Sequence, residues 1–164
     1  QDIELLEGSV AENICRFGDI DEAQLQQAIE LVGLTDFINS LPDKLATQVG
    51  EDGTVFSGGQ RQRLGLARAI YGNPKFVVLD EPNANLDIEG NQALYKLLQH
   101  LKEVGTTVVV VTHKKDILKY SDRILVMKGG KPKIFGPRDL VLDKLAGKDV
   151  KSITPEQASK LTAK

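Results

Sequence analysis

Two adjacent carboxylates, Asp80 and Glu81, follow the compact apolar run FVVL at 76–79. Such a run predicts a strand buried on both faces, and ligands of open α/β sheets gather at the carboxyl ends of the strands. One carboxylate there can hold Mg²⁺ through water, while its neighbour orients or deprotonates an attacking water. The competing interpretation is that Asp80-Glu81-Pro82 forms a polar exit from the strand.

His113 follows a second apolar run, TTVVVV at 106–111. If the two strands are parallel, His113 lies at the same sheet edge as Asp80 and can hydrogen-bond a phosphate and a catalytic carboxylate. An ordinary strand-end histidine is the alternative. We assign His100, on the polar side of the intervening helix, to that simpler interpretation.

The stretch SGGQ at 57–60 lies where a loop becomes a helix. Ser57 and Gln60 fit a capping box, and Gly58-Gly59 leave backbone N–H groups open to close approach. An exposed helix N-terminus binds anions readily, although a plain helix cap explains the same residues.

The elements around these residues predict an α/β unit. A long helix is expected from Ser57 to Tyr71, and a helix at 88–104 connects the two strands in a βαβ unit with parallel strands. Short helices are expected upstream of 43–56, which has no clean period and is interpreted as a loop. Downstream we expect a short helix (KKDILKY), a hairpin around Gly129-Gly130 and a last helix (PRDLVLDKL); TPEQASKL in the lysine-rich tail could form a short helix capped by Thr154.

Length, composition and charge argue against several classes of protein. The 164 residues are enough for one domain, and a net charge of −2 with no dense basic run does not suggest nucleic-acid binding. The longest apolar run is too short to cross a bilayer, and no signal peptide is recognisable. The single Cys15 fits a reducing setting.

Together these motifs resemble the ATPase domain of the ATP-binding cassette (ABC) family. FSGGQ is similar to the family signature LSGGQ, FVVLDEP to the Walker B strand and NANLD at 83–87 to the D-loop. VTH supplies the switch-loop histidine, and QDIELLEG resembles the segment that starts at the Q-loop glutamine, here Gln1.

The resemblance implies an α/β fold: the C-terminal part of a P-loop NTPase domain, with a helical subdomain and a parallel-sheet core. The expected segments are 1–56 (Q-loop and helical subdomain), 57–146 (signature helix, Walker B to switch loop and C-terminal elements) and 147–164 (polar tail). It further implies ATP and Mg²⁺ as ligands. The implied roles are Mg²⁺ site for Gln1 and Asp80, catalysis for Glu81 and His113, and nucleotide contact for Ser57, Gly58, Gly59, Gln60 and Asp87.

Two further stretches of sequence resemble particular subgroups of the family. TQVGEDG at 47–53 resembles the loop before the signature in ABC exporters, which places Glu51 near the transmembrane domains. EPNANLD departs from the common EPTSALD, with Ala84 for serine and Asn85 for alanine, and with RFGDID it resembles bacterial type I secretion ATPases. The loss of the serine hydroxyl puts one expected inter-subunit hydrogen bond in doubt. The implied location is the cytoplasmic face of the bacterial inner membrane, with a periplasmic adaptor and an outer-membrane channel as further partners.

No G-x-x-x-x-G-K-[ST] phosphate loop occurs in the sequence. We therefore expect the chain to be a fragment that starts at the Q-loop, and to bind ATP poorly by itself. In the head-to-tail dimer that the resemblance implies, Gln1, Asp80, Glu81 and His113 hold one ATP, and residues 57–60 of the other subunit close on its γ-phosphate.

Two alternatives stay open. An ABC ATPase that works on DNA would show coiled-coil heptads or a basic stripe, and neither is present in the chain. The second alternative is an interaction module that hydrolyses nothing by itself. A measurement of nucleotide binding by the 164 residues would distinguish it from an ATPase.

Overall fold

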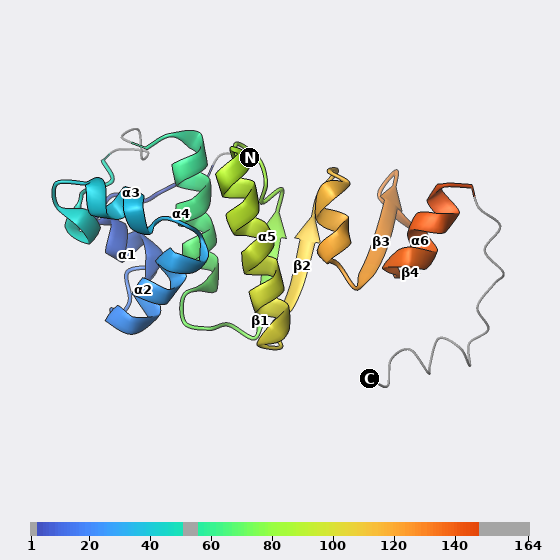
Figure 1. Cartoon of the computed structure of the whole chain (residues 1–164), viewed down its shortest axis with the longest axis horizontal. Coiled ribbons are helices and arrows are strands. Elements are labelled where there is room, and N and C mark those ends of the chain that lie inside the picture. Colours follow the sequence, from blue (N-terminus) through green and yellow to red (C-terminus); the bar gives the residue numbers. More distant parts are fainter. Residues whose placement is uncertain (1–2, 51–55, 148–164) are drawn as a thin grey trace. The chain divides into compact units, whose positions relative to one another are not determined.

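The computed structural model describes residues 3–50 and 56–147. The chain divides into two compact units, Gln1–His113 and Lys114–Lys164, and Figure 1 shows the helices and strands of each. The three predicted segments, 1–56, 57–146 and 147–164, follow motifs rather than this division, and they stay a prediction.

The first unit begins with short helices, as the sequence predicts. They are α1 (Val10–Ile14), α2 (Glu22–Leu31) and α3 (Thr35–Ser40), followed by the 3₁₀ turn η1 (Lys44–Ala46) within the predicted loop. Ser9 and Glu12 form a capping box that fixes the start of α1. Leu25, Ala28 and Ile29 of α2 are buried, which confirms its predicted apolar face.

Helix α4 (Gly58–Ile70) is the predicted long helix, and Figure 1 shows it between the short helices and α5. The Arg16 guanidinium donates to the carbonyl of Arg68 at 2.7 and 3.1 Å and to that of Ala69 at 3.3 Å. Those carbonyls belong to the last turn of the helix, where intrahelical donors run out. The segment after α1 therefore caps the end of α4.

Strands β1 (Phe76–Asp80) and β2 (Thr107–Val111) are joined by α5 (Ile88–Glu103). They pair in parallel, in a register that runs from Phe76 beside Thr107 to Asp80 beside Val111. The predicted βαβ unit is confirmed. Leu94, Leu97, Leu98 and Leu101 of α5 are buried, and Asp87 caps its first turn by accepting from the N–H of Gly90 at 2.7 Å.

The expectation that the first strand is buried on both faces is wrong, and the second strand is not fully buried either. In β1, Val77 and Leu79 are buried, whereas Phe76 and Val78 are 59% and 55% exposed. In β2, Val109 and Val111 are 42% and 53% exposed. Successive side chains of a strand point to opposite faces, and in this unit the described residues cover one of them.

The second unit contains the 3₁₀ helix η3 (Asp116–Tyr120), strands β3 (Arg123–Lys128) and β4 (Lys131–Pro137), and helix α6 (Arg138–Leu145). β3 and β4 form the predicted hairpin, with an irregularity between Val126 and Met127. Among the described residues, no helix has the length and apolarity needed to span a membrane. The helix predicted in TPEQASKL lies outside the described residues.

Candidate functional site

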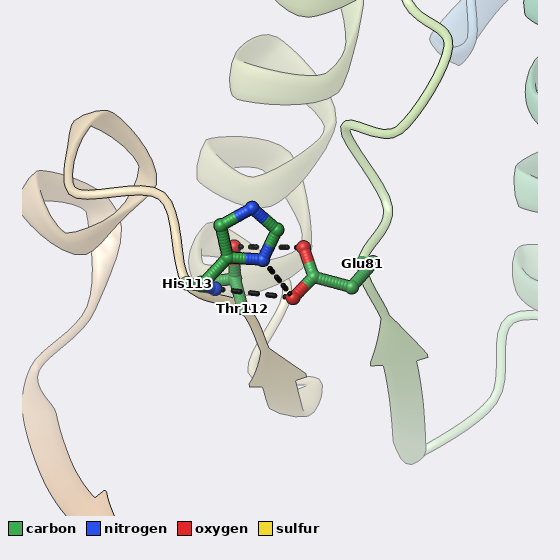
Figure 2. Close-up of polar contacts among 3 residues, drawn as sticks. All are labelled: Glu81, Thr112 and His113. Atoms are coloured by element: carbon green, nitrogen blue, oxygen red, sulfur yellow. Dashed lines mark hydrogen bonds and ion pairs between the residues drawn. The ribbon is translucent and has the colours of Figure 1, made fainter. Parts of the chain in front are cut away.

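Glu81 lies at the carboxyl end of the parallel pair, one residue beyond the register pair of Asp80 and Val111. Its backbone N–H donates to the carbonyl of Val111 at 2.9 Å, which continues the ladder by one step. Thr112 and His113 follow the last residue of β2, at the same end of the strand pair as Glu81. The parallel register therefore brings Glu81 and His113 together, as the sequence predicts (Figure 2).

The two oxygens of the Glu81 carboxyl have different partners. His113 Nδ1 lies 2.7 Å from Oε1, and the backbone N–H of His113 donates to the same oxygen at 3.1 Å. Oε2 accepts from the Thr112 hydroxyl at 3.4 Å, a long hydrogen bond. Oε2 is therefore the oxygen with capacity left for a water molecule.

The pKa of Glu81 is lowered from the ordinary value of a glutamate. Desolvation by burial alone would raise this pKa. The hydrogen bonds and the charge of His113, together with the hydrogen bond from Thr112, act in the opposite direction and outweigh it. Glu81 is therefore held as a carboxylate, the form that can accept a proton from water.

The orientation of His113 leaves one ring nitrogen available. With Nδ1 on a carboxylate oxygen, Nδ1 carries a hydrogen, and Figure 2 shows the other ring nitrogen on the side of the ring away from Glu81. The His113 side chain is 79% exposed, against 27% for Glu81. The pair can thus contact a third group, such as a phosphate oxygen, through the histidine.

Asp80 ends β1 with an exposed side chain beside Glu81. Mg²⁺ in phosphoryl-transfer sites is held by one or two carboxylates together with waters and substrate phosphates. The described residues contain no group of three or more His, Cys, Asp or Glu side chains that could hold a metal by themselves. A single exposed carboxylate fits a magnesium ion shared with a nucleotide, and does not fit a metal site made by the protein alone.

Ser57 and Gln60 form the predicted capping box at the start of α4. The Ser57 hydroxyl accepts from the N–H of Gln60 at 3.2 Å, and Gln60 Oε1 accepts from the N–H of Ser57 at 2.8 Å. In the cap both side chains act as hydrogen-bond acceptors. The N–H groups of Gly58 and Gly59 belong to the first turn, where no intrahelical acceptor exists, and they are the donors suited to an anion.

The segment 81–87 contacts the start of α4. A Cβ added to Gly59 would lie 3.0 Å from the Asn85 carbonyl oxygen, and one added to Gly58 would lie 3.4 Å from Asn85 Cβ. Asn85 has a φ of 58°, a left-handed conformation that asparagine tolerates better than most residues. The two glycines thus permit close packing between the predicted signature and the predicted D-loop of one chain.

The predicted site residues fall into two groups. Glu81 and His113 contact each other with Asp80 beside them, whereas 57–60 and Asp87 begin the helices α4 and α5. Gln1 and Glu51 lie outside the described residues. Sequence reasoning missed Thr112, although a hydroxyl beside His113 at a strand end is a signal that could have found it.

Comparisons with known proteins identify relatives of this chain. A family model described as "ABC transporter" matches residues 1–84. A type I secretion system ATP-binding protein of Rhizobium meliloti is 44% identical over 143 residues, covering 87% of this chain and 25% of that protein. An ATP-dependent lipid A-core flippase of Burkholderia orbicola is 39% identical over 142 residues, covering 87% of this chain and 24% of that protein.

A solved structure resembles the chain as well. A bacterial Atm1-family ABC exporter with ATP bound matches with a TM-score of 0.78 and 28% identity, covering 94% of this chain and 28% of that one. The chain therefore spans about a quarter of the length of the relatives it matches.

Proposed function

This chain belongs to the ABC transporter family, and we propose that it supplies part of the ATP-hydrolysing machinery of an exporter. The observation that carries the proposal is the 2.7 Å contact between His113 Nδ1 and Glu81 Oε1 at the end of the parallel strands. A carboxylate kept ionised beside a partly free histidine suits activation of water next to a phosphate.

In the proposed reaction, Oε2 of Glu81 orients and polarises the attacking water. His113 bridges the γ-phosphate to Glu81 through its second ring nitrogen. Asp80, with Gln1, would hold Mg²⁺, which supplies neutralisation of the phosphate charge when it is bound. Asp87 would contribute a nucleotide contact in addition to its role as the cap of α5.

The start of α4 serves a second nucleotide in this proposal. The N–H groups of Gly58 and Gly59, with the Ser57 hydroxyl and Gln60, close on the γ-phosphate held by a second copy of the ATPase domain. The positive end of the α4 dipole favours negative charge at this position. A head-to-tail dimer therefore follows, with nucleotide at its interface.

For the exported substrate, we favour a protein. The support is the 44% identity to a type I secretion ATP-binding protein, together with Asn83, Asn85 and RFGDID. The 39% identity to a lipid A-core flippase favours a lipid as the second candidate. In cells that lack the intact protein, loss of one or more secreted proteins supports the first, and lipid A-core retained on the inner leaflet supports the second.

The proposal also assigns partners and a location. A transmembrane domain contacts the ATPase near Glu51, on the cytoplasmic face of the bacterial inner membrane. A periplasmic adaptor and an outer-membrane channel complete the assembly if the substrate is a secreted protein. No nucleic acid takes part.

Glu81→Gln tests the proposed reaction. In the intact protein this change removes the carboxylate and keeps the size of the side chain, so ATP hydrolysis should be abolished while ATP binding and dimer closure persist. Phosphate release measures the first, and nucleotide-dependent cross-linking measures the others. Near-normal hydrolysis by this variant would refute the role given to Glu81.

A further inference from the structure

Gln62 is a polar side chain inside the core of the first unit. It is 4% exposed, on the face of α4 that also carries Leu66 and Ile70, four and eight residues further on. Its Nε2 donates to the carbonyl of Pro82 at 3.2 Å. Because a buried amide is costly without a hydrogen-bond partner, this contact fixes where the Pro82 carbonyl can lie.

Pro82 transmits that constraint to its neighbour Glu81. The proline ring fixes φ, so few rotations separate the held carbonyl from Glu81. Glu81 has a φ of 44°, in the left-handed region, and it precedes a proline. A glutamate stays in such a conformation when its surroundings hold it there.

Two backbone–backbone hydrogen bonds and one from a side chain supply that hold. The N–H of Glu81 donates to Val111, and the carbonyl of Glu81 accepts from the N–H of Ala84 at 2.9 Å. The first comes from β2 and the second from the turn itself. The hydrogen bond from Gln62 joins the same turn to α4, a helix 20 residues away in the sequence.

The turn contacts α4 at a second point. Asn85 packs against Gly58 and Gly59, so both ends of 82–85 touch the first turns of the helix. Through these two contacts a displacement of the α4 N-terminus would be passed on to Pro82, and with it to Glu81.

We propose that Gln62 is a positioning residue for Glu81, linking the phosphate-facing start of α4 to the carboxylate of the same chain. The inference rests on the proposed function, because it assumes that Glu81 activates water. Closure of one nucleotide site on the α4 N-terminus would then set the carboxylate that serves the other site.

Gln62→Met in the intact protein tests the link, because methionine keeps the length and helix propensity of glutamine and removes the donor. We expect kcat for ATP hydrolysis to fall about tenfold, the effect of one lost hydrogen bond on a barrier. KM for ATP and ATP-dependent dimer closure should stay within twofold. Gln27→Met, the same change at an exposed position of α2, should match the unaltered protein.

Two results would overturn the inference. One is a kcat for Gln62→Met within twofold of the unaltered protein. The other is a parallel loss of kcat, ATP affinity and closure, which indicates a structural role alone. If Gln62→Met does not fold, Gln62→Asn, which keeps the amide but shortens the side chain, carries the same expectation. A failure of the proposed function itself would be seen in a separate experiment, as near-normal ATP hydrolysis by the Glu81→Gln variant.

Discussion

At the scale of the residue, the carboxyl of Glu81 combines a fixed position with an unequal use of its two oxygens. Oε1 takes both hydrogen bonds of His113, and Oε2 takes the long one from Thr112. This division leaves the carboxylate ionised and one of its oxygens available. The chemistry proposed for Glu81 depends on both properties.

His113→Gln should raise the pKa of Glu81 toward the ordinary glutamate value, because the charge and the shortest hydrogen bond are lost. With its pKa lowered in the folded state, Glu81 adds stability above its unfolded-state pKa, and this is lost as the pH falls through the folded-state pKa. A ¹³C-carboxyl NMR titration, with the signal assigned by Glu81→Gln, measures the shift. His100→Gln, at the other histidine, is the control. An unchanged pKa in His113→Gln would contradict the assignment.

The sequence predicts several site residues and misses others for a physical reason. Asp80, Glu81 and His113 follow apolar runs, so a strand-end position is visible in the local pattern, and the structure places them there. Gln62 and Asn85 act through backbone atoms far away in the sequence. A buried hydrogen bond of that kind leaves no periodic signal, although a glutamine on the apolar stripe of α4 is a hint.

At the scale of the element, the start of α4 is shaped by its two glycines. Neither Gly58 nor Gly59 has a positive φ, so alanine is compatible with the backbone at both positions. Their surroundings differ, because a Cβ at 59 meets a backbone carbonyl at 3.0 Å and a Cβ at 58 meets a side-chain carbon at 3.4 Å.

Gly59→Ala should therefore destabilise the protein relative to Gly58→Ala, by about 1 kcal/mol or more. Gly58→Ala gains helix propensity at an ordinary contact distance, whereas at 59 the same gain is opposed by close contact with Asn85. Urea-induced unfolding of the two variants compares them directly. Equal stability, or a less stable Gly58→Ala, would show that the packing against Asn85 does not constrain α4.

Among the secondary-structure elements, the sequence predicts the long helices best. Ser57, Gln60 and Tyr71 bound α4 where the caps indicate, and the leucines of α5 are buried as their spacing requires. The burial of the strands is the feature that the sequence predicts wrongly. An apolar run shows that a strand can be covered on both faces, but which elements cover it is a matter of tertiary structure.

At the scale of the whole molecule, the chain consists of two compact units and spans about a quarter of its relatives. The boundary after His113 was not predicted, because the predicted segment 57–146 extends across it. Both groups of site residues lie in the first unit. The central claim is that Asp80, Glu81 and His113 serve one nucleotide and residues 57–60 serve another, each site being completed by a second copy of the domain.

Mixed dimers of the intact protein test that claim most directly, with Ser57→Arg and Glu81→Gln as the two changes. If the α4 start serves the partner's nucleotide, placing the changes on opposite chains disables one site twice and leaves the other intact. Placing both on one chain disables both sites. We therefore expect faster ATP hydrolysis from the dimer with the changes on opposite chains. Equal rates, or faster hydrolysis with both changes on one chain, would contradict the claim.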